Sequence, residues 1–118
     1  MPVFSLTKFP IGSYGQSIRA TVVERDATTG ELEAVDISTA TSLKIIFITP
    51  VGDGSRRIEK TATLINSGTD GKMGYTVESG FFASNNPGLI GTWRYKPTFT
   101  LGTYVGGANE WASFRVVD

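Results

Sequence analysis

The stretch Asp36–Val77 reads DISTATSLKIIFITPVGDGSRRIEKTATLINSGTDGKMGYTV and decides the fold of this chain. Residues 43–49 within it are almost continuously apolar, which predicts a central strand covered on much of both faces. Turns containing glycine and aspartate follow at 52–54 and 66–71. Turn signals at strand-length spacing indicate an antiparallel β meander.

Outward from this stretch, the chain keeps the same strand-and-turn rhythm. At Ile18, Ala20 and Val22, apolar residues alternate with residues of the opposite face, as in a strand with one buried face. Pro97 lacks an amide hydrogen, so we expect the strand that contains it to end or bend outward there, near a sheet edge. The predicted strands are 17–24, 43–49, 58–65, 72–77, 92–99 and 110–117, with a glycine-rich hairpin tip at 101–108.

This rhythm predicts an all-β fold. Seven or eight short strands at a spacing of roughly ten residues favour an immunoglobulin-like antiparallel sandwich, with a small barrel as the alternative. We expect an N-terminal arm or edge strand at 1–14 and a single domain at 15–118. The alternating positions predict a core made mostly of Ile18, Ala20, Val22, Leu43, Ile45, Phe47, Tyr75, Trp93, Tyr95, Phe114 and Val116.

Composition excludes several classes of function. The 118 residues include no cysteine and no histidine, which excludes a disulfide framework, thiol chemistry, a histidine base and a Cys or His metal site. Eleven basic and eleven acidic residues are interspersed and give a formal net charge of zero, without the basic stripe of a nucleic-acid binder. No long apolar run is visible. We therefore expect neither a nucleic-acid nor a membrane partner.

Carboxylates and glycines do not form a recognisable reactive site. Glu31 and Glu33 share a face in a loop-like stretch, where we expect solvated surface. Gly52-Asp53-Gly54 and Thr69-Asp70-Gly71 lack the ladder of acids that a calcium loop needs, and Asp-Gly suits a tight turn. We expect no catalytic residue, no cofactor and no metal.

Aromatic and apolar residues at the two ends of the predicted fold are the candidates for contacts with a partner. We expect Phe81 and Trp93 to lie in the core, whereas Trp111 is out of phase with Phe114 and Val116 and should point away from it. Interfaces are enriched in such aromatics. The interface candidates are Phe4, Leu6, Phe9, Tyr104 and Trp111.

Several phrases in fixed order resemble the immunoglobulin-like module of tailed-phage virion proteins, including the module of baseplate upper proteins. After the alternating strand 15–26, the matching phrases are Val35-Asp36-Ile37-Ser38-Thr39-Ala40-Thr41, Phe47-Ile48-Thr49-Pro50-Val51-Gly52, Thr61-Ala62-Thr63, Thr69-Asp70-Gly71 and Gly91-Thr92-Trp93. The resemblance covers about residues 15–117.

The resemblance implies a structural protein of a tailed-bacteriophage virion, made in the host cytoplasm. In baseplate proteins the module is part of a longer chain, whereas here we expect it to stand alone. We therefore expect a capsid decoration, cement or tail accessory protein that binds other virion subunits or further copies of itself. The alternative is a carbohydrate-binding or host-adhesion module that uses Tyr104 and Trp111, so a glycan remains a possible ligand.

Overall fold

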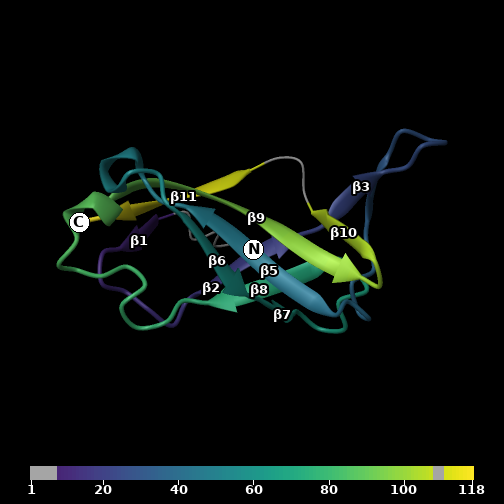
Figure 1. Ribbon diagram of the computed structural model, residues 1–118, viewed down its shortest axis with the longest axis horizontal. Helices are drawn as coiled ribbons and strands as arrows, with labels where there is room; N and C mark the ends of the chain where they lie inside the picture. Colours follow the sequence, from purple (N-terminus) through teal and green to yellow (C-terminus); the bar gives the residue numbers. More distant parts are fainter. Residues whose placement is uncertain (1–7, 108–110) are drawn as a thin grey trace, which may run out of the picture.

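The computed structural model describes residues 8–107 and 111–118, and this part of the chain is all-β (Figure 1). Its strands fall into a large sheet, a smaller sheet and a separate hairpin. The elements are β1 (Lys8–Pro10), β2 (Ser17–Thr21), β3 (Val23–Arg25), β4 (Leu32–Ala34), β5 (Ser42–Ile48), the 3₁₀ turn η1 (Val51–Asp53), β6 (Arg57–Thr61), β7 (Thr63–Leu64), β8 (Lys72–Thr76), the 3₁₀ turn η2 (Pro87–Leu89), β9 (Gly91–Leu101), β10 (Tyr104–Gly107) and β11 (Ala112–Val117).

The large sheet, sheet A, has the order β1-β11-β9-β5-β6, and β10 also pairs with β9. Sheet B has the order β2-β8-β7. The third unit, the β3–β4 hairpin, pairs with neither sheet through a described ladder. No helix in the described residues is long and apolar enough to cross a bilayer.

Sheets A and B enclose the core between them. Phe47 of β5 lies at its centre, and its ring centroid is 5.7 Å from that of Tyr75 on β8 and 6.4 Å from that of Trp93 on β9. The Trp93 indole Nε1–H donates to the Leu89 carbonyl at 2.8 Å, so its buried polar atom is satisfied. The buried apolar cluster comprises Phe9, Ile18, Ala20, Val22, Ile37, Ile45, Phe47, Ala62, Met73, Tyr75, Val77, Phe82, Leu89, Trp93, Phe99, Phe114 and Val116.

Most of the predicted core is confirmed. Leu43 and Tyr95 differ, since they are half-buried and pack against the cluster from its border. The remaining predicted positions, Ile18, Ala20, Val22, Ile45, Phe47, Tyr75, Trp93, Phe114 and Val116, are buried.

The strands are more numerous than the sequence predicts. One reason is β4, which lies in a stretch predicted to be loop, and the other is that two predicted strands are divided where the chain changes pairing partners. The predicted strand 58–65 becomes β6, which pairs with β5, and β7, which pairs with β8. The break falls at buried Ala62, whose amide donates to the Leu43 carbonyl instead of continuing one ladder. The predicted strand 17–24 breaks similarly at Val22, whose amide donates to the Gly71 carbonyl.

Two further expectations about sheet A are wrong. The sheet is not wholly antiparallel, because β1 runs parallel to β11 at its edge. Strand β9 also continues through Pro97 in the interior of the sheet. On one side of β9 the partner strand changes near Pro97. The pairing with β11 reaches Tyr95, and the pairing with β10 includes Thr98. Since no described residue pairs with Pro97 on that side, the missing amide breaks no described ladder.

Candidate interaction surface

The outer face of sheet A is the face turned away from sheet B, and its charged side chains are mostly basic. On β9, Arg94 and Lys96 alternate with the inward-facing Trp93 and half-buried Tyr95. Pairing then brings residues of β5, β6 and β11 in the same phase onto this face. The charged members on β5, β6, β9 and β11, which we call the basic face, are Lys44, Arg57, Arg94, Lys96 and Arg115, together with the acidic Glu59.

Trp111 lies on the basic face, away from the core as its phase predicts. The Arg94 guanidinium carbon is 5.4 Å and the Lys96 Nζ is 4.5 Å from the centroid of its indole ring. Such cation–π contacts contribute about 0.5–1 kcal/mol each where solvent is near. Trp111 is half-buried by these side chains, so it organises two cations instead of presenting a bare ring.

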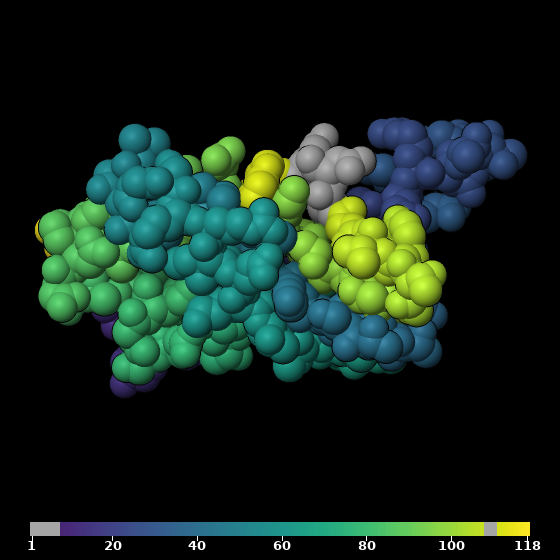
Figure 2. Space-filling model, in the orientation of Figure 1, coloured from purple at the N-terminus to yellow at the C-terminus, as the bar shows by residue number. Residues whose placement is uncertain are grey.

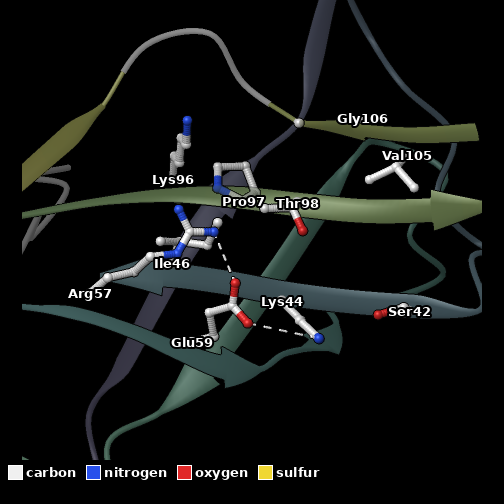
Figure 3. A pocket seen from close by; sticks show the side chains of 11 residues that line it. Ser42, Lys44, Ile46, Arg57, Glu59, Lys96, Pro97, Thr98, Val105 and Gly106 are labelled. Carbon is white, nitrogen blue, oxygen red and sulfur yellow. Dashed lines mark hydrogen bonds and ion pairs between the residues drawn. The ribbon is translucent and has the colours of Figure 1, made fainter. Parts of the chain in front are cut away.

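A shallow depression of about 460 Å³ lies on the basic face between β5, β6, β9 and β10 (Figure 3). Ile46 lines it and is only 4% exposed, although it lies outside the central core cluster. Glu59 on the rim is already shared, since its carboxylate is 2.9 Å from Arg57 and 4.0 Å from Lys44. Among the described residues, no carboxylate lies within ion-pair distance of Arg94 or Lys96.

The β3–β4 hairpin projects from the body at one end of the long axis (Figures 1 and 2). Its three cross-strand pairs are Val23 with Ala34, Glu24 with Glu33, and Arg25 with Leu32. All six residues are exposed. The sequence placed Glu31 and Glu33 on a solvated surface, and both are exposed.

Tyr104 fastens the base of this hairpin. Its hydroxyl donates to the Glu24 carboxylate at 2.9 Å, and its ring meets Phe99 edge-on at 5.8 Å. The hydrogen bond to Glu24 and the negative charge of that group raise the pKa of Tyr104 above its ordinary value. Tyr104 is 53% exposed, but its hydroxyl is already used within the chain.

The structure does not gather the predicted interface residues into one patch. Tyr104 contacts the inward-facing Phe99, whereas Trp111 lies on the opposite face of sheet A with Arg94. A joint aromatic platform of Tyr104 and Trp111 is therefore not formed.

Phe9 corrects another interface prediction. It is 5% exposed and belongs to the core, where its ring centroid lies 5.3 Å from Phe114 and 5.9 Å from Phe82. The strand β1 brings it there by pairing with β11, so Phe9 is not free to anchor a partner. Phe4 and Leu6 lie outside the described residues.

The two turns considered as calcium loops differ in the pairing of their carboxylates. Asp70 Oδ2 lies 3.9 Å from Lys72 Nζ, and its buried Oδ1 has no hydrogen-bond partner among the described residues, whereas Asp53 is bonded within the chain. Asp53 accepts hydrogen bonds from Asn86 Nδ2 at 3.1 Å and Arg56 Nε at 2.7 Å. Desolvation opposes the effect, but these bonds still hold the pKa of Asp53 below its usual value. In the described residues, no cluster of three or more His, Cys, Asp or Glu side chains could hold a metal ion.

A second depression, of about 400 Å³, contains another internally satisfied group. There Glu78 accepts hydrogen bonds from Lys60 and, at 2.8 Å, from the Tyr75 hydroxyl. Burial, reinforced by Glu78, raises the pKa of Tyr75 to about 12. Lys60 and Tyr75 together lower the pKa of Glu78. Lys60, Tyr75 and Glu78 therefore form a structural cluster in which the three side chains bind one another.

The sequence analysis did not predict the two charged surfaces, the basic face of sheet A and the row of carboxylates on the β3–β4 hairpin. The alternation of Arg94 and Lys96 with Trp93 was visible, and it could have indicated one basic face. To predict that Glu24 and Glu33 lie side by side on one face of the β3–β4 hairpin, one needs the register of the two strands, which a single sequence does not give.

Comparison with protein-family models, curated proteins and solved structures finds no match in any of the three.

Proposed function

We propose that this chain is a non-enzymatic structural protein of a tailed-bacteriophage virion, with an immunoglobulin-like fold, that binds capsid or tail subunits as a decoration, cement or accessory protein. The ordered series of phrases similar to those of tailed-phage virion modules carries the proposal. Each phrase lies at an end of a strand or in a connection between strands. Phrase 35–41 leads into β5, 47–52 ends it, 61–63 connects β6 to β7, 69–71 precedes β8, and 91–93 opens β9.

The surface chemistry is compatible with this role. Asp53 and, in the second depression, Glu78 bind neighbouring groups of the same chain, and Asp70 Oδ2 lies 3.9 Å from Lys72 Nζ. Two surfaces are available for contacts with other proteins, the basic face around Trp111 and the exposed β3–β4 hairpin. Charged and aromatic surfaces of this kind give orientation and specificity to protein contacts.

Carbohydrate binding is the second candidate function, and the position of Trp111 on the outer face of sheet A favours it. Sugars stack on exposed aromatic faces, and the two cations beside this ring would suit an acidic sugar. Lys96, however, lies over the indole face that a sugar would use. The contact with other virion subunits therefore ranks first.

Mass spectrometry of purified particles from the phage that encodes this chain tests the proposal, and a density map of the particle locates the protein. We expect it in stoichiometric amounts on the capsid or tail, and Trp111→Ala should lower its incorporation while the isolated variant stays folded. Arg19→Ala, on the outer face of sheet B, is the matched control and should assemble normally. Absence of the protein from particles would refute the structural role, whereas specific binding on a glycan array would favour the second candidate.

A further inference from the structure

The β3–β4 hairpin concentrates negative charge on one of its faces. Glu24 and Glu33 lie directly opposite each other, and like charges in that position destabilise a strand pair. Asp26 and Glu31 follow them in the same alternating phase, and the Asp26 amide donates to the Glu31 carbonyl. In the described part of the chain, none of these carboxylates has a basic side chain within ion-pair distance.

The basic residue of the hairpin does not relieve this repulsion. Arg25 belongs to the other face, with Val23, Leu32 and Ala34, and its guanidinium donates to the Gly30 carbonyl. Asp26 is partly occupied, because its Oδ1 accepts from the amides of Thr28 and Thr29. Glu31 and Glu33 remain exposed and open.

The hairpin also lacks support from its own body. A two-stranded sheet is at best marginally stable in water without a third strand or a packed face. Here Leu32 is 61% exposed, and the described ladders give β3 and β4 no partner except each other. Its described attachments are at its base, through the Tyr104 hydroxyl to Glu24 and through the Val22 amide to the Gly71 carbonyl. Docking against a partner would supply the missing contacts.

The basic face has the opposite charge imbalance, with more cations than described carboxylates to pair with them. Arg94 and Lys96 bind the Trp111 ring but no described carboxylate, and the depression beside them holds Lys44 and Arg57 with only Glu59 to balance both. We propose that copies of this chain bind one another head to tail, with the acidic side of the β3–β4 hairpin of one subunit seated on the basic face of the next. Charge complementarity selects a second copy as the occupant.

This contact joins two different surfaces of the chain, so it is heterologous and closes into a ring or continues as an open row. One hairpin covers less area than a standard protein interface, so a single contact should be weak and sensitive to salt. Repetition in an array would strengthen it by avidity. The inference goes beyond the proposed function and does not require it, since purified protein alone can test it.

Two charge-reversed variants and their mixture provide the test. One variant carries Glu31→Lys and Glu33→Lys, and leaves Glu24 to hold Tyr104. The other carries Arg94→Glu and Lys96→Glu. Sedimentation velocity at low salt should show wild-type oligomers that dissociate in 1 M NaCl, and each variant alone should associate at least tenfold more weakly. An equimolar mixture should recover association, because the two introduced lysines of one variant's hairpin meet the two introduced glutamates of the other variant's face, and the unchanged hairpin and face meet as in the wild type.

Arg19→Glu is the control, since it changes a charge on β2 of sheet B and should leave self-association unchanged. Circular dichroism and thermal melting establish that each variant is folded, and recovery in the mixture by itself requires both to be. A monomeric wild type at every accessible concentration would overturn the inference, as would a mixture that fails to recover association. Binding of heparin by a monomeric wild type, lost in the Arg94→Glu/Lys96→Glu variant, would instead assign the basic face to a polyanion.

Discussion

At the scale of single residues, the aromatic cluster around Phe47 dominates the packing. Its ring approaches those of Tyr75, Phe81 and Phe114 edge-on, with centroids 5.2–6.3 Å apart. Edge-to-face pairs of this kind add about 0.5–1.5 kcal/mol beyond the area that they bury. Because these rings come from both sheets and from the connection before η2, the cluster holds sheets A and B together.

Phe47→Ala should therefore lower the free energy of unfolding by about 3–5 kcal/mol, since it removes a fully buried ring and leaves a cavity. Urea denaturation followed by tryptophan fluorescence measures the loss. Val51→Ala is the matched control because Val51 is 88% exposed, and the change should stay within about 0.5 kcal/mol. A loss below about 1 kcal/mol for Phe47→Ala would contradict the central position of this ring.

Alternation found core residues within strands but not those in connections. It predicted Ile45, Phe47 and Trp93 because strand geometry fixes the face of each side chain. Ile37 and Phe82 are fully buried, yet they lie between strands, where no period applies. Phe9 needed the parallel pairing of β1 with β11, a contact between opposite ends of the chain that local pattern does not specify.

The same limit applies to the candidate surface. The phase of Trp111 correctly predicts its outward side, but not the cations beside it, because Arg94 and Lys96 reach it only through the pairing of β9 with β11. The interface expectation for Tyr104 missed its hydrogen bond to Glu24, a residue far away in the sequence. Local period predicts the side of a strand, and tertiary pairing decides the neighbours.

At the scale of elements, Gly71 controls the junction between β8 and the β3–β4 hairpin. Its φ of +77° is in the left-handed region, and a Cβ there would lie 2.5 Å from the Val22 carbonyl oxygen and 3.0 Å from that of Val35. The Gly71 carbonyl also accepts from the Val22 amide. Backbone therefore surrounds this glycine and cannot move aside without displacing the hairpin base.

Gly71→Ala should cost more than about 3 kcal/mol, because a backbone clash adds to the left-handed strain of about 1–2 kcal/mol. Gly30→Ala is the matched control. Gly30 has a φ of +75° with open space around its Cβ position, so the strain alone should remain, about 1–2 kcal/mol. Denaturant melts of both variants measure the difference, and equal losses would show that the junction yields to the added methyl group.

The element scale also explains why the strand boundaries differ from the prediction. The interruptions between strands at Val22 and Ala62 contain no glycine or proline, so the local sequence gives no sign that the backbone changes its pairing partner there. Pro97 is the opposite case: it is a strong local signal, yet β9 continues through it, because no described residue pairs with Pro97 on the other side of β9. All-β class followed from period and turns, whereas the assignment of strands to sheets depended on long-range contacts.

At the scale of the whole molecule, stabilised carboxylates are distributed over almost every part of the fold. Hydrogen bonds from the Thr29 and Thr28 amides lower the pKa of Asp26, and bonds from Ser38 lower that of Asp36. Arg57 lowers the pKa of Glu59, and Lys60 with Tyr75 lowers that of Glu78. The folded chain therefore holds these groups ionised more strongly than the unfolded chain does.

A carboxylate with a lowered pKa in the folded state stabilises the fold fully above its unfolded pKa and loses that contribution as the pH falls through the folded value. We therefore expect the free energy of unfolding to be nearly constant from pH 7 to about pH 5 and to fall progressively below about pH 4.5. Urea melts across this range measure the profile. Glu78→Gln should flatten the acid limb, because it removes a group whose pKa is lowered by Lys60, whereas Glu31→Gln, at an exposed hairpin position, is the control. A fold that gains stability from pH 5 to pH 3 would show that these hydrogen-bonded carboxylates do not govern its response to acid.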